Sequence, residues 1–145
     1  MTKARQVARP GLGLARVLLV DADLTSRLTL QTVLEAGGYR VDAAASAAEA
    51  VGKLEKSEYE LVLSDLQMES PEAGLKVLAH ARMMEYKPAR ALITTYRNSR
   101  RRAAAAKSGN TMLIEPEDLP ELLGKVAELI SERATRKVER QLRHA

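Results

Sequence analysis

Two aspartates stand where the sequence could support metal and phosphate chemistry. Asp21 closes the apolar run RVLLVD, and Asp65 closes the run ELVLSD. Two carboxylates held close together repel each other unless a cation neutralises them, and Mg²⁺ is a hard cation that takes oxygen ligands of this kind. A hydroxyl such as that of Thr94 could donate a hydrogen bond to a phosphoryl oxygen nearby. Acids also end strands as solvated turn residues, so the residue types alone leave both interpretations open.

These residues follow predicted strands. Short apolar runs alternate along the chain with segments of helical periodicity, which predicts five strand–helix units. The predicted strands are 16–21, 39–45, 60–65, 89–95 and 111–115. Strands that alternate with helices form a parallel sheet covered on both faces, and such a sheet binds ligands beyond the carboxyl ends of its strands. We therefore expect Asp21, Asp65, Thr94 and Glu115 at one edge of the sheet.

Local signals mark where the helices begin and end. Gly37 and Gly38 predict the end of the first helix, and Ser46 with Glu49 three residues later predicts a capping box that opens the second. A third helix is expected over 74–84 and a short basic one over 98–108. The last helix begins near Glu117, with apolar residues along one stripe.

Composition narrows the class of protein. The chain has 145 residues, enough for one domain, and its 46% hydrophobic and 29% charged residues are typical of a globular protein. It has no cysteine and two histidines, which argues against disulfides, thiolate catalysis and zinc sites. No apolar run reaches the roughly 18 residues of a membrane span, and no secretory signal begins the chain, so we expect a cytoplasmic protein.

Four segments resemble the receiver domain of bacterial two-component response regulators. They are VLLVDAD (17–23), LVLSDLQM (61–68), LITTY (92–96) and IEP (114–116), and the similarity covers roughly residues 15–130. The resemblance implies an α/β, flavodoxin-like (βα)5 fold, a doubly wound parallel sheet of five strands in the order 2-1-3-4-5. It also implies a signalling domain that transfers a phosphoryl group to its own aspartate, rather than a separate enzyme.

The resemblance assigns roles to individual residues. Asp65 corresponds to the aspartate that accepts the phosphoryl group, and Thr94 to the hydroxyl that contacts that group after activation. Mg²⁺ would be bound by Asp21, Asp65 and the backbone carbonyl of Gln67. Asp23 is a further candidate ligand, one residue beyond the usual position of the second acid.

Three positions to which the family assigns a role differ from its pattern. Ala22 stands where the second acid of the family's adjacent pair falls, and Glu115 replaces the lysine before Pro116. Met112 takes the usual aromatic position on the fifth strand. Two functions therefore stay open: a receiver switched by phosphorylation of Asp65, or a degenerate receiver that binds partners without phosphorylation.

The implied partners follow from the same resemblance. A histidine kinase or phosphotransfer protein would supply the phosphoryl group. A downstream protein would bind the surface formed by 98–108, the fifth strand and the last helix, and a homodimer is an open alternative. With no Phe or Trp for base stacking, and no helix-turn-helix, we do not expect direct DNA binding. The role of the basic cluster from Arg97 to Lys107 stays open.

The predicted domain boundaries follow the composition. Residues 1–13 form a flexible leader with Pro and Gly, 14–130 the receiver domain, and 131–145 a basic helical extension or the stub of a linker. The extension carries five Lys or Arg against two Glu.

Overall fold

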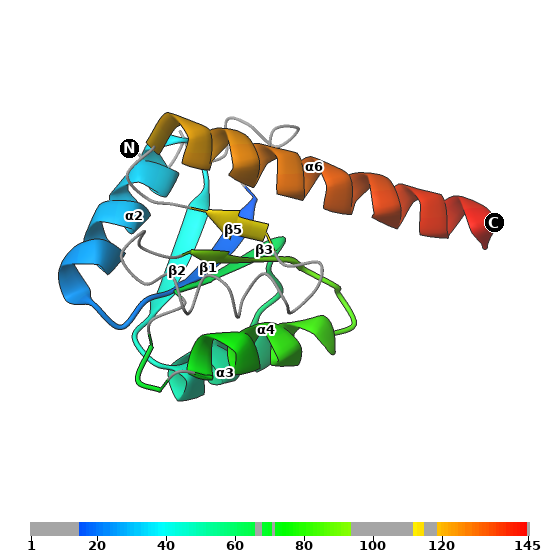
Figure 1. Cartoon of the computed structure of the whole chain (residues 1–145). Helices are drawn as coiled ribbons and strands as arrows, with labels where there is room; N and C mark the ends of the chain where they lie inside the picture. Colours follow the sequence, from blue (N-terminus) through cyan, green and yellow to red (C-terminus); the bar gives the residue numbers. More distant parts are fainter. Residues whose placement is uncertain (1–14, 66–67, 71, 94–111, 115–118, 145) are drawn as a thin grey trace, which may run out of the picture.

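The core of the molecule is a five-stranded parallel sheet (Figure 1). The computed structural model describes residues 15–65, 68–70, 72–93, 112–114 and 119–144. The strands are β1 (Arg16–Val20), β2 (Arg40–Ala44), β3 (Leu61–Asp65), β4 (Ala89–Ile93) and β5 (Met112–Ile114). Their order is β2-β1-β3-β4-β5, which confirms the predicted doubly wound topology.

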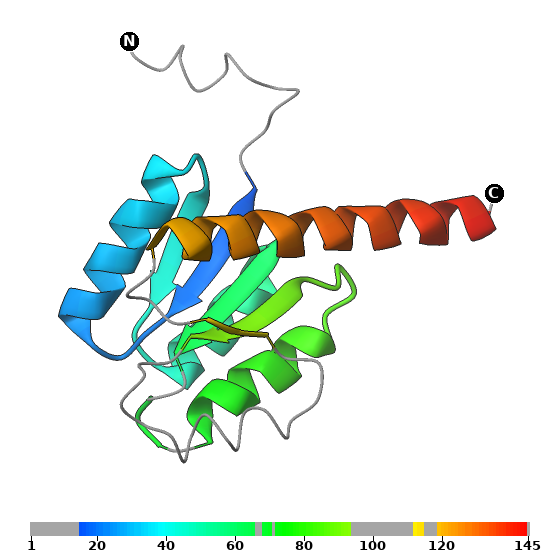
Figure 2. The same ribbon diagram turned by 45° about the horizontal axis from the view of Figure 1, so that its top comes forward.

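Helices cover both faces of the sheet (Figure 2). They are α2 (Leu24–Ala36), α3 (Ala47–Lys56), α4 (Ala73–Arg82) and α6 (Leu119–Arg143). Successive strand residues point to opposite faces, so each apolar strand feeds two cores. On one face Leu18 and Val20 pack with Leu54 of α3 and Val77 of α4. On the other face the core contains Val17, Leu19, Leu34 of α2 and Leu122 of α6.

The predicted helix boundaries are largely confirmed. Ser46 caps α3 and accepts a hydrogen bond from the Glu49 nitrogen at 3.2 Å. The Glu49 carboxylate accepts from the Ala45 nitrogen at 2.8 Å, one residue before the expected capping-box donor. Gly37 caps the end of α2, and Gly38 takes a left-handed φ of 102° there. The predicted helix over 98–108 lies outside the described residues.

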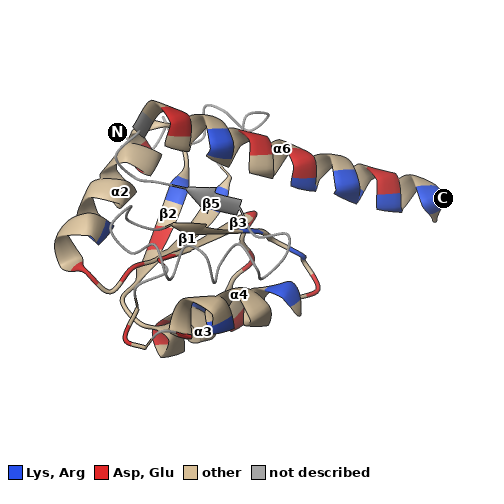
Figure 3. Ribbon diagram, in the orientation of Figure 1, with Lys and Arg blue, Asp and Glu red and all other residues tan. Residues whose placement is uncertain are grey.

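The last helix changes character along its length. Leu122, Val126 and Leu129 are buried against the sheet, whereas every described residue from Ser131 onward is exposed or half-buried. Figure 1 shows this second part projecting past the body of the domain, and Figure 3 shows that it carries charges of both signs. No helix within the described ranges is long and apolar enough to cross a membrane.

Candidate functional site

The register of the sheet places the two predicted aspartates side by side. In the parallel pairing of β1 with β3, Val20 lies opposite Ser64. Asp21 and Asp65 are the next residues, so both lie at the carboxyl edge, where the topology predicts a site. Asp21 is 1% exposed, and Asp65 is half-buried.

Hydrogen bonds fix the backbone of Asp21. Its nitrogen donates to the Ala44 carbonyl at 3.0 Å, which continues the ladder between β1 and β2. Its carbonyl accepts a hydrogen bond from Nη1 of Arg27 at 2.8 Å. The side chain therefore has a defined direction at the end of the strand.

The Asp21 carboxylate is buried with little polar compensation. Oδ1 accepts a hydrogen bond from the Asp23 nitrogen at 2.9 Å. Within the described ranges this is its one hydrogen bond, and no cationic side chain pairs with it. A buried carboxylate without a cation is unfavourable, because burial removes its hydration. A small cation at this position would compensate for that loss.

Asp23 has a structural role at the start of α2. Its Oδ2 accepts a hydrogen bond from the Ser26 nitrogen at 2.8 Å, which makes Asp23 the N-cap of the helix. Its side chain is exposed, as is that of Ala22 before it. One of its two carboxylate oxygens is thus committed to the helix.

Asp65 is positioned from the opposite side by α4. A Cβ atom at Gly74 would overlap the Asp65 carbonyl oxygen, so the helix approaches the strand end as closely as only glycine permits. The Oγ of buried Ser64 lies 3.4 Å from the same carbonyl. These contacts hold the backbone from which the Asp65 carboxylate projects.

The other predicted site residues are placed less fully. Gln67, Thr94 and Glu115 lie outside the described residues. Met112 is the first residue of β5.

The described acids suit Mg²⁺ better than a metal that needs several protein ligands. No group of three or more His, Cys, Asp and Glu gathers as a metal site in the described ranges. Mg²⁺ is commonly held by one or two carboxylates and keeps several waters. The buried Asp21 carboxylate beside Asp65 fits that donor set.

Two residues that position the site did not emerge from the sequence as such. Arg27 follows Asp21 by six residues, and its contact is to a backbone oxygen, which no residue pattern reveals. Gly74 is visible in the sequence as a glycine after the third strand, but its closeness to Asp65 depends on how α4 packs.

Comparison with known proteins gives one family. The family model of the response regulator receiver domain matches residues 17–127. No curated protein sequence matches the chain.

Solved structures of response regulators share the fold. A CheY-like receiver domain protein from Methanospirillum hungatei JF-1 is 26% identical, with a TM-score of 0.73 over 86% of this chain and 99% of that one. The response regulator TrrA from Thermotoga maritima, solved in complex with Mg²⁺-BeF, is 28% identical, with a TM-score of 0.68 over 80% and 99%. The chemotaxis response regulator CheY4 of Vibrio cholerae is 26% identical, with a TM-score of 0.65 over 81% and 98%. The chain belongs to the response regulator receiver domain family, and its place is in two-component signalling.

Proposed function

We propose that Asp65 accepts a phosphoryl group from a phosphohistidine of a histidine kinase or phosphotransfer protein. A carboxylate oxygen of Asp65 forms a bond to phosphorus while the phosphorus–nitrogen bond of the donor breaks. The departing imidazole nitrogen keeps the electron pair and is protonated from water. We place this exchange in the cytoplasm, a reducing compartment with which the cysteine-free sequence is compatible.

The observation that carries this proposal is the buried carboxylate of Asp21 beside Asp65. Asp21 is 1% exposed and its carboxylate accepts one hydrogen bond from the described residues, so this side chain favours a bound cation. Asp21, Asp65 and the Gln67 carbonyl would hold Mg²⁺, which when bound neutralises the carboxylates and the phosphoryl oxygens. The Mg²⁺-BeF complex of TrrA, 28% identical to this chain, supports the assignment.

Thr94 and the surface formed by 98–108, β5 and α6 would transmit the effect of phosphorylation to a partner. The Thr94 hydroxyl would donate a hydrogen bond to a phosphoryl oxygen, and its movement would alter the surface formed by 98–108, β5 and α6. A downstream protein that prefers the altered surface would then bind. A second copy of the chain is the alternative occupant of that surface.

The experiment is phosphate incorporation from acetyl phosphate, with and without Mg²⁺. We expect Mg²⁺-dependent incorporation in the wild type and its complete loss in Asp65→Asn. Glu85→Gln is the matched control, because it removes the same charge at an exposed position away from Asp21 and Asp65. Incorporation that is absent, or that survives in Asp65→Asn, would overturn the proposal; its absence favours the phosphorylation-independent receiver.

A second variant tests the two departures from the family pattern. Ala22→Asp with Glu115→Lys restores an adjacent pair of acids and a cation, both of which favour a phosphoaspartate with bound metal. We expect a higher level of phosphorylation than in the wild type. An unchanged level would show that these positions do not limit the reaction.

A further inference from the structure

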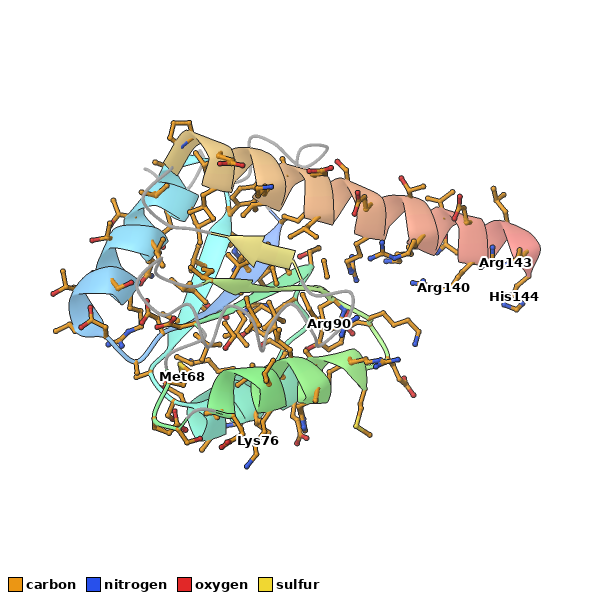
Figure 4. All side chains as sticks on the ribbon, viewed as in Figure 1. Met68, Lys76, Arg90, Arg140, Arg143 and His144 are labelled. Carbon is orange, nitrogen blue, oxygen red and sulfur yellow. The ribbon has the colours of Figure 1, made fainter. Side chains whose placement is uncertain are left out.

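A basic groove lies at the edge of the sheet opposite Asp65. It has a volume of about 240 Å³ and is formed by the end of α4, the turn before β4, β4 itself and the projecting part of α6. Six cationic residues line it: Arg82, Lys87, Arg90, Arg133, Arg136 and Arg140. In Figure 4 Arg140 extends from α6 on the side where Arg90 of β4 lies. The groove is therefore separate from the carboxyl edge.

The cations of this groove have no acidic partner in the part of the chain that the structure describes. No acid lines it, and none of its six cations forms an ion pair there. Arg16 shows the contrast, because its guanidinium lies 3.2 Å from Asp42. Burial, and then the positive charges of Arg82 and Arg136, lower the pKa of Arg90. The positive charge is thus concentrated, and no acid of the described lining compensates it.

Hydrogen bonds hold one wall of the groove in place. Arg133 of α6 donates from Nε to the Lys87 carbonyl at 3.0 Å and from Nη2 to the Tyr86 carbonyl at 2.7 Å. Lys87 has a left-handed φ of 47° in this turn, a conformation that non-glycine residues adopt infrequently. These bonds anchor α6 to the body of the domain, so the cations face one another before any ligand arrives.

The groove can recognise a ligand mainly through charge and through hydrogen bonds from its guanidinium groups. Arg133, Arg136 and Arg140 are three and four residues apart, so they share one face of the helix. A guanidinium presents a planar fork of N–H donors that matches phosphate oxygens. Among the residues that the structure describes, no aromatic side chain lines the groove to stack on a base or a sugar. We propose that this groove binds a small anion that carries several phosphate groups, either a free oligophosphate or the phosphate chain of a nucleotide.

The test is calorimetric titration of the full chain with inorganic tripolyphosphate in Mg²⁺-free buffer. We expect binding that weakens as salt is added. Arg136→Gln with Arg140→Gln removes two groove cations and should weaken it by about tenfold or more. Lys137→Gln with Arg143→Gln is the matched control, with the same change of charge on the same helix outside the groove lining. It should weaken binding much less, and circular dichroism confirms that both variants fold.

The competing outcomes are distinct. Equal weakening by both double variants would show a diffuse attraction to net charge and overturn the proposal. Binding of a short duplex DNA without binding of tripolyphosphate would also overturn it, in favour of a nucleic-acid surface. Titration with adenosine triphosphate then distinguishes a free oligophosphate from a nucleotide as the ligand. Affinity equal to that of tripolyphosphate supports recognition of the phosphates alone, and tighter binding supports a nucleotide.

Discussion

The two edges of the sheet carry opposite charge in different surroundings. At the carboxyl edge Asp21 is buried, and the strand ladder and the Arg27 side chain hold its backbone. At the amino end of β4 the arginines line an open groove, and half of its cations come from a helix that projects past the domain. An enclosed carboxylate selects a small hard cation, whereas an open basic groove accepts a larger anion. This difference in enclosure is the reason why we propose an ion site at the first edge and a surface for a polyanion at the second.

A substitution at Gly74 should disrupt the carboxyl edge of the sheet more than any other change considered below. Gly74→Ala would place a Cβ atom against the Asp65 carbonyl, and α4 would have to move away. We expect a loss of about 2–3 kcal/mol in the free energy of unfolding, measured with urea, together with weaker Mg²⁺ binding. Gly124→Ala is the control, because a Cβ atom at that position of α6 would meet nothing within 4 Å. That variant should be more stable by about 0.5–1 kcal/mol; equal losses in both would contradict the close approach.

Asp21→Asn tests whether the buried carboxylate serves the cation rather than the fold. The amide oxygen can still accept the Asp23 hydrogen bond, but the buried charge is gone. We expect Mg²⁺ affinity to fall by at least about tenfold. Without metal, the Asp21→Asn variant should be more stable than the wild type by about 1 kcal/mol, because it no longer buries the carboxylate charge. Mg²⁺ titration and urea unfolding measure the two effects, and a loss of metal-free stability would contradict the assignment.

Asp23→Ala separates a helix cap from a metal ligand. Removing the acceptor for the Ser26 nitrogen should lower stability by about 1 kcal/mol. Asp23→Asn keeps a capping oxygen and should restore most of that loss. We expect Mg²⁺ affinity to change far less than in Asp21→Asn. If Asp23→Asn instead weakens Mg²⁺ as much as Asp21→Asn does, Asp23 is a ligand as well as a cap.

The two edges of the sheet also differ in how far they could be predicted from the sequence. Five short apolar runs sufficed to predict the strands, whereas their order was implied by the resemblance to receiver domains. In that order the parallel topology brings Asp21 next to Asp65. The basic groove could not be predicted in the same way. Helical periodicity puts Arg133 and Arg136 on one face, but only the packing of α6 brings that face to Arg90. Contacts between distant segments depend on packing angles that local patterns do not contain.

Tyr86, in the turn beside the groove, should make the stability of the protein depend on pH in the alkaline range. The Tyr86 hydroxyl donates to the Leu54 carbonyl at 2.9 Å. Burial, and then the charge of Glu58, raise the pKa of Tyr86 to about 12, although Arg133 lowers it. The contribution of the protonated phenol to stability is fully present below its ordinary pKa of 10. This contribution is lost as the pH rises from 10 to 12.

Tyr86→Phe isolates this contribution. We expect it to lower stability at neutral pH by about 0.5–1 kcal/mol through the lost hydrogen bond. Its stability should then fall less steeply than that of the wild type between pH 10 and 12, as followed by urea unfolding monitored by circular dichroism. Tyr59, whose pKa burial also raises, contributes equally to both proteins and does not affect the difference. Parallel pH profiles would contradict the assignment.

The smallest expected effect lies in the groove without any ligand. Because Arg136 and Arg82 face Arg90 as like charges, Arg136→Gln should raise the free energy of unfolding. Arg136 is exposed, so solvent screening limits the gain to about 0.2–0.5 kcal/mol at low salt. The gain should vanish near 1 M salt, where the screening length falls to about 3 Å. Lys137→Gln, one residue along but outside the groove lining, should give a smaller gain. If the two variants gain equally, the repulsion belongs to the whole helix and not to the groove.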